Sequence, residues 1–150
     1  MPLAATPEDT RFFHDWLDRF ARMVRDVDYA PARPMFDDAV LAFGTHMDIV
    51  EGLGPYERQQ WHSVWPTIDG FAFRLDLVRI GLSDDRSMAF VMAPWTSTGY
   101  HRDGSAYPRP GRATLVFGRR GGAWKVIHSH MSLNPGTPGP SHKAKPPKSI

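Results

Sequence analysis

The sequence predicts an α+β fold, with helices near the N-terminus packed on one face of a curved antiparallel sheet. A strong helical pattern covers the first part of the chain, short apolar segments separated by turn residues follow, and the last apolar pair forms a β-hairpin. The chain has 150 residues, of which 41% are hydrophobic and 12% aromatic. This composition is typical of one globular domain with a sizeable core.

The first helix is predicted over residues 7–27. Thr6 is a good N-cap, Pro7 suits the first helical position, and acidic residues follow in the first turn. Apolar residues then recur at helical spacing and form one buried stripe: Phe13, Trp16, Leu17, Phe20, Val24 and Val27.

The middle of the chain predicts short elements. Residues 29–36 contain two prolines and predict a loop or a short helical turn. Residues 39–43 and 46–50 predict two short strands, and a second helix runs from Pro55 to about Trp65, where Pro66 ends it. Further strands are predicted at 71–80 and 87–96, and a mobile loop rich in glycine and proline at 98–111.

The predicted hairpin spans residues 112–132 and contains the most unusual polar pattern. A strand at 113–117 leads into a turn at 118–122, whose glycines supply positive φ angles, and a second strand follows. Strict alternation along this second strand places one set of side chains on a common face: Trp124, Val126, His128, His130 and Ser132. Two imidazoles beside Trp and Val indicate either a polar-floored pocket or histidines that core partners satisfy.

Composition excludes several classes of protein. The absence of cysteine excludes disulfides and thiolate catalysis, and no apolar segment approaches membrane-spanning length. The N-terminus shows no signal-peptide pattern, so we expect a cytoplasmic protein without membrane contact. The net charge of +2 is more than accounted for by Lys143, Lys145 and Lys148. We therefore expect no nucleic-acid partner, a single domain over residues 1–133, and a disordered Pro/Gly/Lys-rich tail over 134–150.

Two segments resemble the SnoaL-like family of the nuclear transport factor 2-like superfamily. They are FGTHMDIVEG before the second helix and the ending Arg112-x-Thr114 followed by Gly-x-Trp124-x-x-x-His128-x-His130-x-Ser132. The superfamily includes ketosteroid isomerases and the calcium/calmodulin-dependent kinase II association domain. The resemblance covers about residues 7–133. It implies a cone-shaped sheet wrapped around the N-terminal helices (a cystatin-like fold) and a homodimer formed through the open face of the sheet.

Members of this superfamily include isomerases, polyketide cyclases, dehydratases, ligand-binding modules and assembly domains, so the fold does not choose among them. If the protein is an enzyme, abstraction of a proton beside a carbonyl needs a base in a dry pocket and a donor facing the developing enolate. Asp48 is our candidate base, with Asp76 as a second candidate. His130 is the acid–base partner or an alternative base, and Tyr100 is a polar anchor. The simpler interpretation of Asp48 is an exposed residue at a strand end.

Several other residues are candidates for substrate binding. Arg112 and Thr114 share a strand face, and an arginine inside an apolar cone needs an anion, which is either a structural acid or a ligand carboxylate. His128 and His130 have the spacing of a metal pair, with His46 or His101 as a third ligand, but hydrogen bonding within the cavity is the favoured interpretation. We expect no metal and no cofactor. An aromatic lining that suits a flat ligand is predicted from Trp61, Trp65, Trp95 and Phe90, although each of these rings is also typical of a core.

Together these observations predict a small, cofactor-independent protein that holds a hydrophobic or aromatic molecule. Its activity, if any, is isomerisation, cyclisation or dehydration by general acid–base chemistry. The alternative is a non-catalytic ligand-binding or assembly module in which Arg112 and the two histidines form a structural network.

Overall fold

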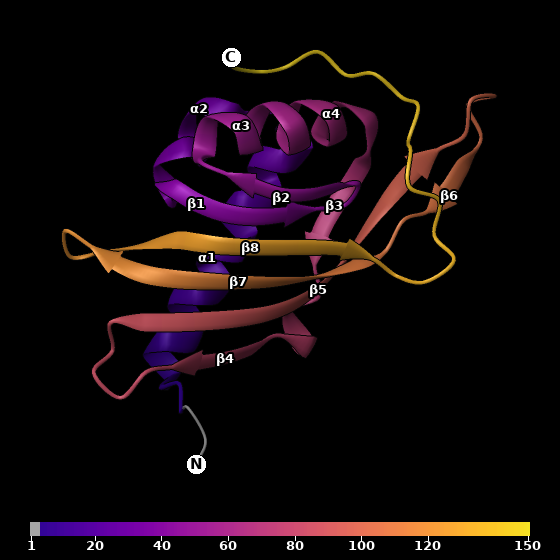
Figure 1. Ribbon diagram of the computed structural model, residues 1–150. Coiled ribbons are helices and arrows are strands. Elements are labelled where there is room, and N and C mark those ends of the chain that lie inside the picture. Colours follow the sequence, from indigo (N-terminus) through magenta and orange to yellow (C-terminus); the bar gives the residue numbers. More distant parts are fainter. Residues whose placement is uncertain (1–3) are drawn as a thin grey trace.

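The computed structural model describes residues 4–150 and confirms the α+β class. Helix α1 (Pro7–Asp26) begins with Thr6 as N-cap, and the Thr6 hydroxyl and the Asp9 carboxylate satisfy each other's backbone N–H groups. Its apolar stripe is buried against the concave face of the sheet, behind β7 and β8 in Figure 1. The predicted first helix is therefore confirmed.

A second helical layer packs beside α1 and consists of short, nearly continuous turns. Its elements are α2 (Tyr29–Ala32), η1 (Arg33–Met35), α3 (Leu53–Tyr56), η2 (Glu57–Trp61), α4 (His62–Val64) and η3 (Trp65–Thr67). Element η2 is a π-helical turn, and the wider turn directs the consecutive side chains of Gln60 and Trp61 into the protein. The predicted second helix thus exists, and Pro66 lies in its last turn.

Eight strands form one curved sheet, with the path β2-β1-β8-β7-β5-β3, and β4 and β6 also pair with β5 (Figure 1). Only the β1–β8 pair among the described strands is parallel. The strands are β1 (Phe36–Gly44), β2 (Met47–Glu51), β3 (Asp69–Phe73), β4 (Arg79–Leu82), β5 (Met88–Tyr100), β6 (Ala106–Pro108), β7 (Gly111–Arg120) and β8 (Ala123–Leu133).

Two predicted segments differ from the structure. The strand predicted at 71–80 is divided by the turn η4 (Leu75–Leu77), so that β3 and β4 pair with different parts of the long strand β5. The loop predicted at 98–111 is instead a hairpin, because β5 continues to Tyr100 and β6 pairs back onto it. The loop was predicted from the glycines and prolines of this stretch, but both residue types also occur in edge strands and hairpins.

A β-bulge in β8 changes the face of the two histidines. The β7–β8 register shifts between Phe117, which pairs with Val126, and Val116, which pairs with His128. Ile127 is the extra residue, so the buried positions change from Trp124 and Val126 to Ser129 and Met131. The prediction that His128, His130 and Ser132 share a face with Trp124 and Val126 is therefore wrong.

Two further features bear on the sequence expectations. None of the described helices is long and apolar enough to cross a membrane. Residues 134–150, which we expected to be disordered, follow an extended course from the end of β8 across the helical layer (Figure 1).

Candidate functional site: a cavity at Arg109

A small cavity lies inside the cone between α1, the second helical layer and the sheet. Its volume is about 30 Å³, which is room for about two water molecules. Three tryptophans predicted to surround a ligand, Trp61, Trp65 and Trp95, line it, and each is at most 4% exposed. Their role in ligand binding stays a prediction.

The cavity contains one charged side chain, that of Arg109. Arg109 is 2% exposed and lies opposite Ser97 of β5, between β6 and β7. Its backbone N–H donates to the Ser97 carbonyl, and its own carbonyl accepts from the Ser97 hydroxyl. Its Nη2 donates to the Gly139 carbonyl at 3.2 Å, whereas Nε and Nη1 have no partner. Arg109 forms no ion pair with any residue of the described range 4–150. Burial lowers the pKa of its guanidinium.

Other polar groups line the same space. The indole N–H groups of Trp61 and Trp95 are buried without a hydrogen-bond partner. Tyr56 shares a 3.1 Å hydrogen bond with Ser129, and burial raises the pKa of Tyr56 to about 12, so its hydroxyl stays protonated. Gln60 accepts from the Thr45 backbone N–H and donates to the Thr45 hydroxyl. The unpartnered groups in the cavity are therefore all donors, which favours a ligand with acceptor atoms.

A larger chamber adjoins the cavity at Arg109, which lines both spaces. This outer chamber has a volume of about 260 Å³ and lies between the end of the helical layer and the C-terminal segment. Val64 and Thr67 line one side of it, and residues 139–141 line the other. His46, which shares a 3.3 Å hydrogen bond with Ser63, stands at its rim.

The structure brings four motif residues together, but on the outer face of the sheet. Arg112, Thr114, His130 and Ser132 line a depression there, and Arg112 Nε donates to Ser132 Oγ at 3.2 Å. Arg112 and His130 are exposed. The expectation that Arg112 points into the cone is wrong, because the inward positions of β7 are Gly111, Ala113, Leu115 and Phe117.

The remaining sequence candidates also lie outside the cavity. Asp48 is exposed on β2, and Asp76 pairs with Arg74 at the surface. His128 Nδ1 is 2.8 Å from the Leu41 carbonyl. Phe90 faces the outer side of β5, so it does not join the aromatic lining.

Tyr100 lies near the outer chamber, and its hydroxyl donates a 2.6 Å hydrogen bond to the Asp69 carboxylate. The catalytic roles of Asp48 and His130 stay predictions, without a shared cavity in which to act. No group of three potential metal ligands is found among the described residues.

Arg109 was missed although the sequence contains its signal. Extending the alternation of the apolar residues Ala113, Leu115 and Phe117 toward the N-terminus leads to Gly111, Arg109 and Tyr107. The prolines at 108 and 110 made this stretch look like a loop.

A sequence-family profile described as the SnoaL-like domain matches residues 14–135. The chain belongs to the SnoaL-like domain family. No curated protein sequence matches the chain.

Solved structures show the same fold. A protein of Novosphingobium aromaticivorans assigned as an aromatic ring hydroxylase has a TM-score of 0.72 at 19% identity, covering 91% of this chain and 96% of its own. A protein of Streptomyces avermitilis assigned as a dehydratase of the nuclear transport factor 2-like family has a TM-score of 0.68 at 17% identity, covering 87% and 100%. The association domain of the Caenorhabditis elegans calcium/calmodulin-dependent kinase II has a TM-score of 0.66 at 14% identity, covering 83% and 95%.

Proposed function

We propose that this SnoaL-like protein binds a small hydrophobic or aromatic acid at the cavity around Arg109. The observation that carries the proposal is the buried guanidinium with two donor atoms lacking a partner and no acid beside it. A buried charge of this kind is costly to the fold, and a ligand carboxylate supplies the missing partner through charge-assisted hydrogen bonds. The tryptophans around it suit an apolar or aromatic body.

The geometry supports binding more strongly than general acid–base catalysis. None of the described residues lining the inner cavity is an aspartate, glutamate or histidine. Among the described residues that line the outer chamber, His46 is the one titratable side chain besides Arg109. The solved relatives include proteins assigned as a dehydratase and a ring hydroxylase. If this chain shares such chemistry, we expect His46 to be the proton carrier, since the two ring nitrogens of an imidazole can donate and accept a proton.

The test compares benzoate with its neutral analogue benzamide, using quenching of tryptophan fluorescence. We expect benzoate to bind more tightly than benzamide to the unaltered protein. Arg109→Gln should weaken benzoate binding by roughly 10- to 100-fold, the loss expected for charged hydrogen bonds in a buried site. Arg112→Gln is the matched control on the outer face and should leave the affinity unchanged. Equal benzoate binding by Arg109→Gln and the unaltered protein would contradict the proposal.

A second function, homo-oligomeric assembly, is favoured by the outer face of the sheet. Leu41, Ile49 and Met92 are 49%, 65% and 52% exposed on this face, beside the Arg112 depression. Exposed apolar side chains grouped on one face are typical of association surfaces. We propose that two copies pair through it. Ile49→Glu combined with Met92→Glu should reduce the mass measured by light scattering to that of one chain. Phe12→Glu, on the helical side, should not.

A further inference from the structure

The C-terminal strap, which we define as residues 137–150, has no regular helix or strand but is fastened along its length. Its backbone N–H groups at His142, Lys145 and Lys148 donate to the carbonyls of Tyr100, Pro66 and Val27 at 2.8 to 2.9 Å. These acceptors belong to the end of β5, the second helical layer and the end of α1. The strap therefore ties the sheet to both helical layers.

The first part of the strap forms one wall of the outer chamber. The Gly139 carbonyl accepts from Arg109, and the Pro140 carbonyl accepts from the Tyr107 hydroxyl at 2.7 Å. Ser141 donates to the Thr67 carbonyl at 2.6 Å. The strap thus covers Arg109 from the chamber side, and its Gly139 carbonyl takes one of the hydrogen bonds that a ligand carboxylate would accept.

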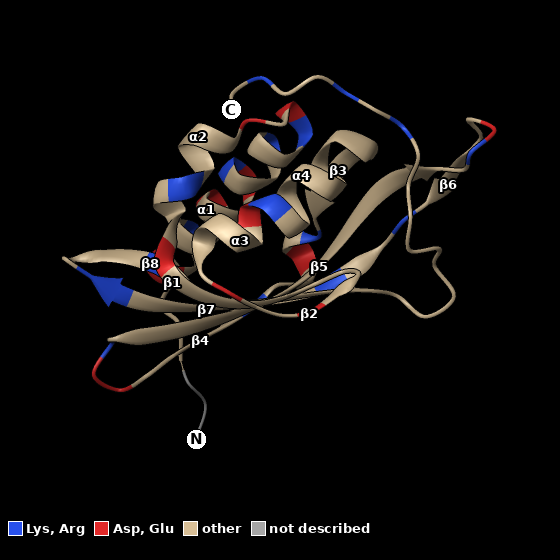
Figure 2. Ribbon diagram, turned by 45° about the horizontal axis from the view of Figure 1, so that its top comes forward, with Lys and Arg blue, Asp and Glu red and all other residues tan. Residues whose placement is uncertain are grey.

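The middle of the strap is held by Asp69 at the start of β3. Its carboxylate accepts from Lys143 Nζ at 2.5 Å and from Tyr100, and Lys145 Nζ lies 3.4 Å away. Together these contacts lower the pKa of the Asp69 carboxyl to about 2, and the hydrogen bond from Lys143 contributes most. Figure 2 shows the basic residues spaced along this otherwise uncharged segment. The lysines that make the tail basic in the sequence therefore face acids of the folded domain.

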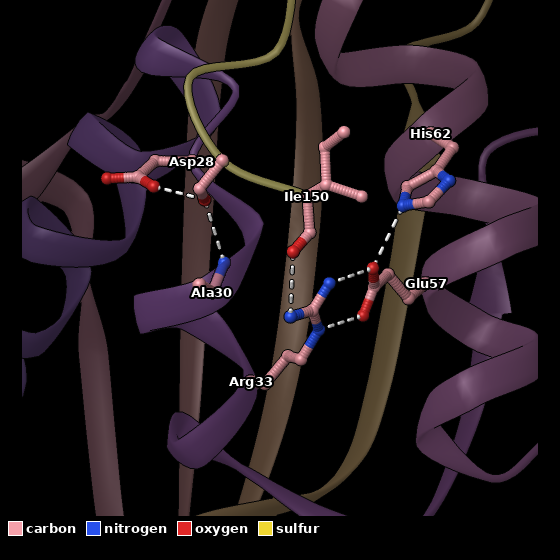
Figure 3. A network of polar contacts seen from close by, with 7 residues as sticks. Asp28, Ala30, Arg33, Glu57, His62 and Ile150 are labelled. Atoms are coloured by element: carbon pink, nitrogen blue, oxygen red, sulfur yellow. Dashed lines mark hydrogen bonds and ion pairs between the residues drawn. The ribbon is translucent and has the colours of Figure 1, made fainter.

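The end of the strap is docked on α2 and η1 (Figure 3). The Ser149 hydroxyl donates to the Asp28 carboxylate and accepts from the Ala30 backbone N–H. Arg33 donates to the Ile150 backbone oxygen at 3.3 Å. Arg33 is itself fixed by two hydrogen bonds to Glu57, at 2.6 and 2.8 Å. Glu57 also pairs with His62.

The strap matters for binding because it bounds the larger of the two spaces that Arg109 lines. The inner cavity, at about 30 Å³, holds no organic molecule as it stands, whereas the outer chamber of about 260 Å³ is bounded by the strap. The strap buries little apolar surface, since most of its residues are exposed. Segments held mainly by exposed polar contacts open at lower free energy than core strands and helices. Of the elements bounding the outer chamber, the strap is therefore the one expected to open first.

We infer that the C-terminal strap is the gate of the cavity, and that ligands reach Arg109 when the strap lifts from Asp69. The inference rests on the proposed function in one respect, namely that the cavity takes a ligand. The gate itself is a property of the unliganded protein.

The gate is tested without a ligand, by acrylamide quenching of tryptophan fluorescence. Asp69→Asn removes the partner of both lysines and should raise the quenching constant of the buried cavity tryptophans by about three- to tenfold, as expected for losing two partly exposed ion pairs that hold a lid. Asp76→Asn is the matched control, because it removes an exposed acid away from the strap. Deletion of residues 137–150 should have at least the effect of Asp69→Asn, with circular dichroism to verify the fold. Unchanged quenching in both variants would overturn the inference.

A spin label tests whether the strap is seated. The chain has no cysteine, so Ala144→Cys, at an exposed strap position, provides a single labelling site. We expect an immobilised nitroxide spectrum, and a mobile one after Asp69→Asn is added. A mobile spectrum without Asp69→Asn would overturn the inference. Benzoate separates the two proposals: faster benzoate association in Asp69→Asn supports both, whereas a seated, releasable strap with no benzoate binding leaves the gate and removes the acid-binding function.

Discussion

Arg109 and Arg112 lie three residues apart on one extended segment, yet they face opposite sides of the sheet. Arg109 is 2% exposed among tryptophans, with two donor atoms unpartnered. Arg112 is exposed and donates to Ser132 beside His130 and Thr114. The face of the sheet therefore decides the role of an arginine. On the concave face Arg109 is a candidate ligand anchor, and on the convex face Arg112 is part of a candidate contact surface. The two faces are expected to respond differently to matched substitutions.

The largest difference is expected for apolar residues. Trp61 is 1% exposed and stacks on Trp65 with ring centroids 4.7 Å apart. Trp61→Ala should reduce the free energy of unfolding by about 3–5 kcal/mol, because it leaves a cavity in the core. Met92→Ala on the convex face should cost less than about 0.5 kcal/mol in the isolated chain. Urea unfolding measures both, and similar losses would show that the convex face is also part of the folded core.

The two serines of β8 form the next comparison. Ser129 is fully buried and partners the Tyr56 hydroxyl, whereas Ser132 bonds Arg112 on the convex face. Ser129→Ala leaves the Tyr56 hydroxyl buried without a partner and should cost about 1–3 kcal/mol. Ser132→Ala should change stability by less than about 0.5 kcal/mol. Thermal unfolding followed by circular dichroism compares them. If Ser132→Ala costs more, the side assignment after the bulge would be contradicted.

The smallest expected effect concerns the two arginines and has the opposite sign. Arg109→Met replaces a desolvated, unpaired charge with an apolar side chain and should increase the free energy of unfolding by about 1 kcal/mol. Arg112→Met should leave it unchanged within about 0.5 kcal/mol. Urea unfolding without ligand makes the measurement. A clear loss of stability in Arg109→Met would mean that Arg109 serves the fold rather than a ligand.

The polar residues of the family signature illustrate how far sequence reasoning extends. The family is indicated by the segment FGTHMDIVEG and by the ending that contains Arg112, Thr114, Trp124, His128, His130 and Ser132. Such a sequence pattern does not depend on which face each side chain takes. The same spacing predicted the wrong face for both histidines, because Ile127 is an extra residue in β8 and nothing in its local sequence marks a bulge. Of the four rings predicted to line one pocket, Trp61, Trp65 and Trp95 line the cavity, whereas Phe90 lies on the outer side of β5.

The sequence by itself determined the fold class, the first helix, the final hairpin and the family, because each depends on local periodicity, capping or residue spacing. Only the tertiary structure decided which arginine is enclosed and which acids the terminal lysines meet. Both depend on contacts between residues far apart in the chain, such as Asp69 with Lys143. A local pattern states that a side chain alternates or carries charge. It does not state which residues the side chain will face. At Arg109 those residues are the cavity tryptophans and the strap, and they make the candidate site.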